Sequence, residues 1–194
     1  MVRWEPGATD RLRVAALDLY LQRGYEQTTV GEIAKSVGLT ERTFFRHFAG
    51  KREVLFDGEE QLQQAFVDAV AAAPPDSTPL GLIATALTET AEYFGKDRRT
   101  WSRKRHQVIS ANQPLKEREL LKMASLATAV ADALRRRGVA DPTAALAAQT
   151  GVTVFAVAFE QWIADGETRS LAAVERDILR EFRILIDALE TAEP

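Results

Sequence analysis

The residues best suited to chemistry in this chain are hydrogen-bond donors gathered in one short stretch. Arg42 and Arg46 stand four residues apart, with Thr40 and Thr43 beside them. This spacing places several donors on one side of a helix. A guanidinium presents a planar fork of N–H donors that matches the edge of guanine or two phosphate oxygens. The stretch therefore indicates recognition of a base edge or an anion rather than bond breaking.

Catalytic chemistry has little support elsewhere in the 194 residues. The chain has no cysteine and two histidines, His47 and His106, so thiolate catalysis, disulfides and cysteine-ligated zinc are excluded. No nucleophile is paired with a base, and no glycine loop suits a phosphate. We expect no catalytic residue, no metal site, no cofactor and no enzyme activity.

The formal net charge of −3 hides an uneven distribution. Residues 1–52 carry nine basic and six acidic side chains, whereas the remaining residues are net acidic. One basic run, Lys96 to Arg105, interrupts that acidic part. The asymmetry indicates a small module that faces an anion, attached to an acidic body.

The periodicity of the apolar residues predicts an all-α protein. They recur at intervals of three and four, and most glycines and prolines fall between the periodic segments. We expect two domains, a head of residues 1–56 and a body of residues 57–194. The nine predicted helices cover residues 10–23, 30–37, 41–47, 51–72, 79–94, 98–111, 114–137, 141–164 and 171–189.

Two short helices of the head have the spacing of a helix-turn-helix. Thr29 and Glu32 form a predicted capping box at the start of the first, and Thr40 is a natural N-cap of the second. Ala34 is small enough for the helices to cross closely, and Gly38 suits the left-handed turn between them. In this motif the second helix enters the major groove of DNA with its N-terminal half toward the base edges.

A longer pattern surrounds these two helices within residues 10–56. It consists of Ala15-Ala16-Leu17, Leu19-Tyr20, Gly24-Tyr25, Thr28-Thr29-Val30, Ile33-Ala34, Gly38-Leu39-Thr40, Thr43-Phe44-Phe45-Arg46-His47-Phe48 and Lys51. In this pattern the sequence resembles the TetR family of bacterial transcriptional regulators. Residues 103–126 are also similar to the C-terminal domain of an actinobacterial subgroup that includes mycofactocin-type regulators.

The resemblance implies which head residues meet double-stranded DNA. Thr40, Arg42, Thr43 and Arg46 are expected to face the groove. Phe45 departs from the family pattern, in which a tyrosine hydroxyl reaches a phosphate, so only an apolar contact is expected there. The residues expected at phosphates are Thr29, His47 and Lys51.

The last two predicted helices carry wide apolar faces, which indicates burial on more than one side. The resemblance implies a homodimer held by a four-helix interface, which suits a palindromic operator with half-sites about 34–36 Å apart. The alternative is that both faces pack within one subunit. The expected interface residues are Val152, Phe155, Phe159, Trp162, Ile178, Phe182 and Leu185.

The middle helices are expected to enclose a small-molecule effector, which we expect to be apolar with an anionic group. The alternative is that their apolar residues are ordinary core. The basic run allows three interpretations: a solvated face paired with acids, attraction to DNA, or binding of an anionic head group. The expected ligand residues are Tyr93, Phe94, Trp101, His106, Gln107, Ile109 and Met123.

Together these patterns predict a cytoplasmic, ligand-responsive repressor, since no signal peptide or membrane helix is evident. The effector is expected to tilt the long fourth helix and so change the spacing of two recognition helices. The alternative function is a ligand-binding or adaptor protein that no longer binds a specific operator. The sequence also leaves open whether the regulator represses or activates.

Overall fold

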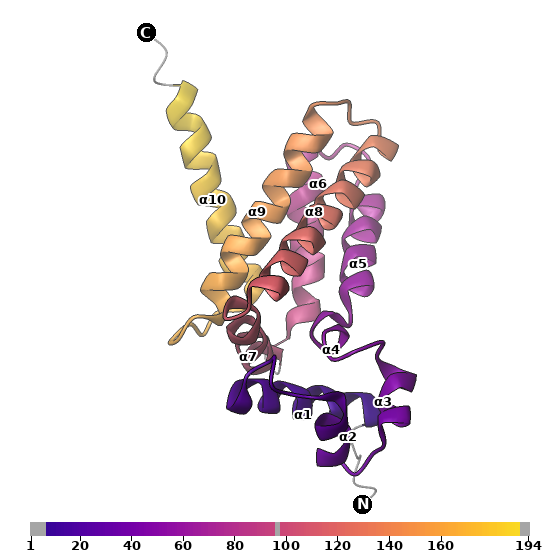
Figure 1. The fold of residues 1–194 in the computed structure, drawn as a ribbon. Helices are drawn as coiled ribbons and strands as arrows, with labels where there is room; N and C mark the ends of the chain where they lie inside the picture. Colours follow the sequence, from indigo (N-terminus) through magenta and orange to yellow (C-terminus); the bar gives the residue numbers. More distant parts are fainter. Residues whose placement is uncertain (1–6, 96–97, 191–194) are drawn as a thin grey trace, which may run out of the picture. The chain divides into compact units, whose positions relative to one another are not determined.

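The structure, a computed structural model, describes residues 7–95 and 98–190, and every regular element in these ranges is helical. The expected all-α fold class is therefore confirmed (Figure 1). The elements are α1 (Ala8–Arg23), α2 (Val30–Ser36), α3 (Glu41–His47), α4 (Glu53–Phe56), α5 (Glu59–Ala72), α6 (Pro79–Ala91), the 3-10 helix η1 (Glu92–Phe94), α7 (Arg98–Ser110), α8 (Gln113–Arg136), α9 (Thr143–Ile163) and α10 (Leu171–Glu190).

The predicted fourth helix is two helices, and the other eight lie close to their predicted ends. Asp57 is extended, with φ −62° and ψ 131°, which ends α4. Gly58 then adopts φ +93°, a left-handed conformation that glycine reaches without steric cost. The single rod expected over residues 51–72 is therefore wrong, because two consecutive non-helical residues interrupt its hydrogen-bond ladder.

The chain forms two compact units, and each is considered by itself. The first contains Met1–Gly58 together with Ser102–Glu119, and the second contains Glu59–Trp101 together with Leu120–Pro194. The sequence-based division assigned residues 102–119 to the body. In the structure Lys104 pairs with Asp18 at 2.8 Å, which ties this segment to α1.

In the first unit, α1 packs against α2 and α4, and α2 packs against α3. Leu12, Ile33 and Phe44 are fully buried where these helices meet. Gly38 has φ +72°, so the turn between α2 and α3 uses the left-handed conformation that the sequence predicted. This small apolar centre sets the position of α3.

In the second unit, α6 packs against α5, α9 and α10. Gly151 on α9 permits the close approach to α6, because a Cβ there would lie 2.8 Å from Cγ2 of Ile83. Helices α9 and α10 pack against each other in an antiparallel arrangement (Figure 1). By length and composition alone α9 is apolar enough to cross a membrane, but its Val152, Phe155 and Trp162 lie in the core of this unit.

Candidate functional site

The start of α2 is built as predicted. The Thr29 hydroxyl accepts from the Glu32 backbone N–H at 3.2 Å, and the Thr29 backbone N–H donates to the Glu32 carboxylate at 2.9 Å. These hydrogen bonds complete the capping box. The bond from the Thr29 backbone lowers the pKa of Glu32, so the carboxylate stays charged at the helix N-terminus. The hydroxyl of Thr29, expected at a phosphate, is thus also part of the cap.

Helix α3 presents the residues that were expected to face DNA. Thr40 caps it by accepting from the Thr43 backbone N–H at 3.2 Å. Arg42 and Arg46 are exposed, and within residues 7–95 and 98–190 neither makes a hydrogen bond or ion pair. Phe45 is 54% exposed although it is a large apolar side chain. The helix therefore offers two uncommitted guanidinium groups and one aromatic ring on a capped support.

His47 and Lys51, both expected at phosphates, are engaged inside the first unit. Nδ1 of His47 lies 3.0 Å from the hydroxyl of Thr9, and its Nε2 is buried. The Lys51 ammonium donates to the backbone carbonyls of Tyr25, Glu26 and Thr28 at 2.9, 3.2 and 3.1 Å. All three donors of Lys51 are thereby used, which favours a structural role over a phosphate contact.

The tertiary structure shows why Lys51 occupies this place. Its Nζ also lies 4.5 Å from the ring centroid of Tyr25, and its own backbone carbonyl accepts from the Tyr20 hydroxyl at 2.6 Å. Burial raises the pKa of Tyr20, so the phenol remains a donor. Lys51 therefore joins α1, the loop that follows it and the segment after α3.

The basic run is used structurally rather than left as a free patch. Arg105 is 8% exposed, donates to the Leu55 carbonyl at 2.5 Å and pairs with Glu119 at 2.5 Å. Arg98 lies 4.2 Å from the ring centroid of Tyr93. The first interpretation, a solvated face paired with acids, fits only in part, because Lys104 and Arg105 pair with acids but Arg105 is buried and Arg98 lies over an aromatic ring. Lys96 lies outside the described residues. The spacing of Arg105 from buried Ser102 and Val108 could have revealed its burial.

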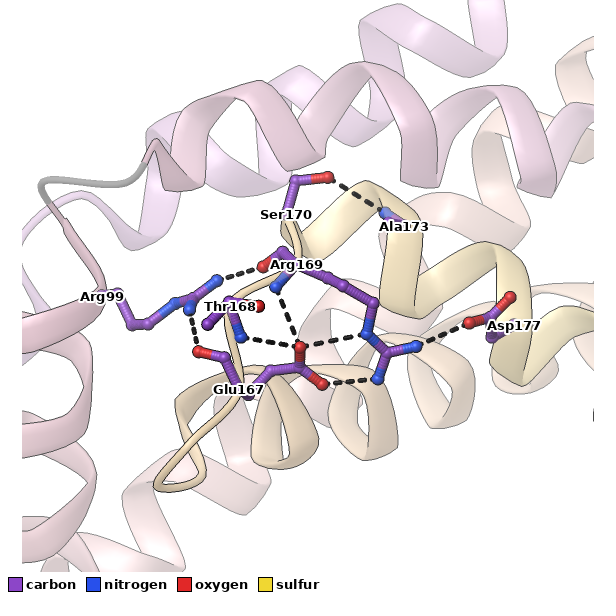
Figure 2. A network of polar contacts seen from close by, with 7 residues as sticks. All are labelled: Arg99, Glu167, Thr168, Arg169, Ser170, Ala173 and Asp177. Atoms are coloured by element: carbon purple, nitrogen blue, oxygen red, sulfur yellow. Dashed lines mark hydrogen bonds and ion pairs between the residues drawn. The ribbon is translucent and has the colours of Figure 1, made fainter.

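The connection between α9 and α10 is held by the network in Figure 2. The guanidinium of Arg99 donates to the backbone carbonyls of Glu167 and Arg169 and lies 5.0 Å from the ring centroid of Trp162. The Arg169 side chain binds both Glu167, at 3.0 Å, and Asp177, at 2.7 Å. The hydrogen bonds from Arg169 lower the pKa of Glu167 to about 2. This network fixes how α10 leaves α9.

Aromatic side chains line the middle of the second unit. Phe94 of η1 lies 5.7 Å from both Phe155 and Phe159 and 6.0 Å from Trp162, measured between ring centroids. Phe66 of α5 joins the cluster through Phe155 at 5.8 Å. The contacts are tilted or edge-to-face, as favoured by ring quadrupoles. The second unit thus contains a continuous aromatic cluster shared by three elements.

Sequence reasoning missed Glu175, an acid in the core of the second unit. Its side chain is 1% exposed, and neither carboxyl oxygen has a hydrogen-bond partner among the described residues. Burial raises the pKa of Glu175 to about 8. The signal was present in the sequence, because Glu175 follows Leu171 by four residues on the apolar stripe of its helix.

Comparison with known protein families identifies the family to which the chain belongs. Residues 12–57 match the family described as bacterial regulatory proteins, tetR family. Residues 77–186, more than half of the chain, match the family described as MftR C-terminal domain. The chain belongs to the TetR family. Its members are DNA-binding regulators, which confirms that the chain is a transcriptional regulator and not an enzyme.

One curated protein is similar in sequence to part of this chain. The HTH-type transcriptional regulator TcmR of Streptomyces glaucescens is 43% identical over 78 residues, which is 40% of this chain and 34% of that protein. The match thus spans about a third of the length of this relative.

Solved structures of the family show the same fold. FadR from Bacillus subtilis, in complex with stearoyl-CoA, has a TM-score of 0.62 at 16% identity and covers 88% of this chain and 95% of its own. FadR from Thermus thermophilus, in complex with lauroyl-CoA, has a TM-score of 0.51 at 21% identity, with 89% and 91% covered.

The ligand residues expected for this TetR-family chain are divided between the two units. Tyr93, Phe94 and Met123 pack against the core of the second unit, which also contains half-buried Trp101. The other three belong to the first unit, where Ile109 is buried, Gln107 is exposed and His106 lies 3.1 Å from the Ser110 hydroxyl. The three were grouped with the others because α7 was assigned whole to the body.

The expected dimer residues are also divided by their exposure. Val152, Phe155 and Trp162 are buried in the core of the chain itself, and Phe159 and Ile178 pack partly against it. Phe182 is half-buried, and Leu185 is 67% exposed. A stripe pattern cannot distinguish these cases, because apolar residues mark burial against any surface.

Proposed function

We propose that this TetR-family chain is a repressor that binds a palindromic operator through α3 and is released by a small-molecule effector. The observation that carries the proposal is the state of Arg42 and Arg46, which are exposed on a capped helix and make no hydrogen bond or ion pair with the described residues. An arginine that reads guanine needs its donors available and its helix fixed. An adaptor protein without operator binding has no need of either.

The two parts of the chain have separate tasks in this proposal. The head, residues 1–56, binds DNA, and residues 57–194 bind the effector and form a homodimer in the cytoplasm. Exposed apolar side chains of the last two helices support a dimer, since Val157 is 46%, Ile184 53% and Leu185 67% exposed. Such side chains are free for a second copy, whereas the buried α9 residues are not.

The effector acts by population shift. It lowers operator affinity by as much as its affinity differs between the DNA-bound and released conformations. The related FadR structures contain acyl-CoA molecules, which supports an effector with a long apolar part.

Loss of one guanidinium tests the proposal. Arg46→Ala is expected to weaken specific binding by ~1–3 kcal/mol, because a contact to a base edge is lost. Fluorescence anisotropy compares double-stranded DNA from upstream of the chain's own gene with a scrambled duplex of equal length. Arg180→Ala is the matched control, since Arg180 is an exposed arginine of α10. Equal losses on both duplexes would assign Arg46 to a phosphate instead.

A further inference from the structure

The position of Glu175 is unusual for an acid. On α10 it lies between Leu171 and Leu179 along one helical face, and Val174 precedes it. Leu171 and Val174 are buried in the core of the second unit, and Leu179 packs against that core. The carboxyl group of Glu175 therefore lies within the apolar interior rather than at its edge.

In the described part of the chain no hydrogen bond compensates for this burial, and the charge of Arg176 offsets it only in part. Neither oxygen of Glu175 has a hydrogen-bond partner in the described part of the chain. Helices α6 and α9 pack most extensively against α10, and all of their buried residues are uncharged. The one buried hydroxyl of α6, Thr90, donates to backbone carbonyls of its own helix. On α10 itself, Arg176 is exposed to solvent.

Other acids of this chain are treated differently. Glu119 pairs with Arg105, and Glu167 pairs with Arg169. A buried polar group without a partner costs free energy, so native proteins rarely keep one unless it has a use. Glu175 is thus the acid that the described part of the chain leaves buried without a hydrogen-bond partner.

Aromatic rings lie at the same end of the α9–α10 hairpin. Helix α9 ends at Ile163, and α10 begins at Leu171 and packs back along it, so the first turns of α10, with Glu175, lie toward the end of α9 that carries Phe159. Phe159 belongs to the cluster with Phe94 and Trp162, and the guanidinium of Arg99 already lies over the Trp162 ring at 5.0 Å. The faces of aromatic rings attract cations, especially in a desolvated interior.

We propose that Glu175 is the polar anchor of the effector site and that it binds the protonated amine of an otherwise apolar effector. The inference deepens the proposed function and rests on it. An ammonium group supplies donors to both carboxyl oxygens and a positive charge to the aromatic surroundings. An anionic head group supplies neither, so this anchor replaces the anionic effector that the sequence suggested.

The proton balance of binding follows from the burial of Glu175. Burial holds the pKa of its carboxyl at about 8, so at pH 7 the free protein carries the proton there. A bound ammonium stabilises the carboxylate and lowers that pKa, and the proton leaves to solvent. Amine binding is therefore accompanied by release of nearly one proton, which alcohol binding does not cause.

Isothermal titration calorimetry of the full-length protein tests the proposal with three probes of equal chain length: dodecylamine, dodecanol and dodecanoate. Titrations at pH 7 in buffers of different ionisation enthalpy count the protons released. We expect dodecylamine to bind wild-type protein at least tenfold more tightly than dodecanoate does, with proton release. Glu175→Gln is expected to lose at least tenfold in amine affinity and to release no proton, while dodecanol binding changes less than twofold.

The matched control is Glu181→Gln, which removes an exposed acid from the same helix. Thermal melting followed by circular dichroism verifies that each variant is folded. Absence of amine binding to wild-type protein, amine affinity in Glu175→Gln within twofold of wild type, or tighter binding of dodecanoate overturns the anchor. DNA binding of the free protein is measured separately, so a chain that binds its operator but fails these titrations loses the anchor and keeps the proposed function.

Discussion

The two units differ in how they treat a buried acidic or basic side chain, Arg105 in the first and Glu175 in the second, although Nε2 of His47 in the first unit is also buried without a partner among the described residues. In the first unit the Tyr20 hydroxyl donates to a carbonyl at 2.6 Å, the Thr28 hydroxyl to another at 2.9 Å, and Arg105 to a third at 2.5 Å. In the second unit the carboxyl of Glu175 has no such partner among the described residues. Satisfied polar groups specify one arrangement, whereas an unsatisfied group favours any state that supplies its partner. The contrast is in keeping with the proposed division of the chain into a DNA-binding part and an effector-binding part.

The largest expected effect is a pH dependence of the unfolding free energy that arises from Glu175 in the second unit. Folded protein holds the Glu175 proton up to about pH 8, whereas the unfolded chain releases it near pH 4.5. The folded state therefore binds more protons in this window. The contribution of Glu175 to the free energy of unfolding is fully present below pH 4.5. It is lost as the pH rises through 8, at up to ~1.4 kcal/mol per pH unit.

Urea unfolding at pH 5, 6, 7 and 8 measures this slope, with Glu175→Gln as the comparison. The variant lacks the titrating group, so its unfolding free energy is expected to depend less on pH. Parallel pH profiles for the two proteins would show that Glu175 is hydrated or paired in solution, and the contrast between the units would disappear.

The next effect concerns Lys51 in the first unit. Lys51→Met keeps most of the apolar stem and removes three hydrogen bonds to carbonyls, so we expect a loss of about 2–4 kcal/mol in unfolding free energy. Lys35→Met, at an exposed lysine of α2, is the matched control. If Lys51→Met leaves stability unchanged but weakens binding to every DNA sequence and makes the salt dependence shallower, Lys51 contacts a phosphate instead.

The smallest effect compares two glycines. At Gly151 a Cβ would lie 2.8 Å from the Ile83 side chain, whereas at Gly31 it would meet only the flexible end of Glu41, at 2.5 Å. Gly151→Ala is expected to destabilise by about 1–3 kcal/mol through overpacking. Gly31→Ala is expected to change stability by less than about 1 kcal/mol, because Glu41 is exposed and can move aside.

Thermal and urea unfolding of both variants measure this difference. In an Ile83→Ala background the cost of Gly151→Ala should vanish, since the contacted atoms are gone. If Gly151→Ala still destabilises the protein in that background, the close contact at Gly151 is not with the Ile83 side chain.

Much of the first unit was predictable because its determinants are local. The caps at Thr29 and Thr40 use residues three positions away, and Gly38 needs only its own φ. The second unit was predictable in outline only. Its apolar stripes identified the helices, but they did not distinguish the core positions Val152 and Trp162 from the exposed Leu185.

The sequence by itself determined the helices other than the one expected over residues 51–72, the helix-turn-helix and the exposure of Arg42 and Arg46, since periodicity and capping act within a few residues. Only the tertiary structure decided the partners of the buried charges. Lys51 finds carbonyls up to 26 positions away and Arg105 one that is 50 positions away. Such partners depend on how distant helices pack, and the same packing encloses Glu175 without one among the described residues.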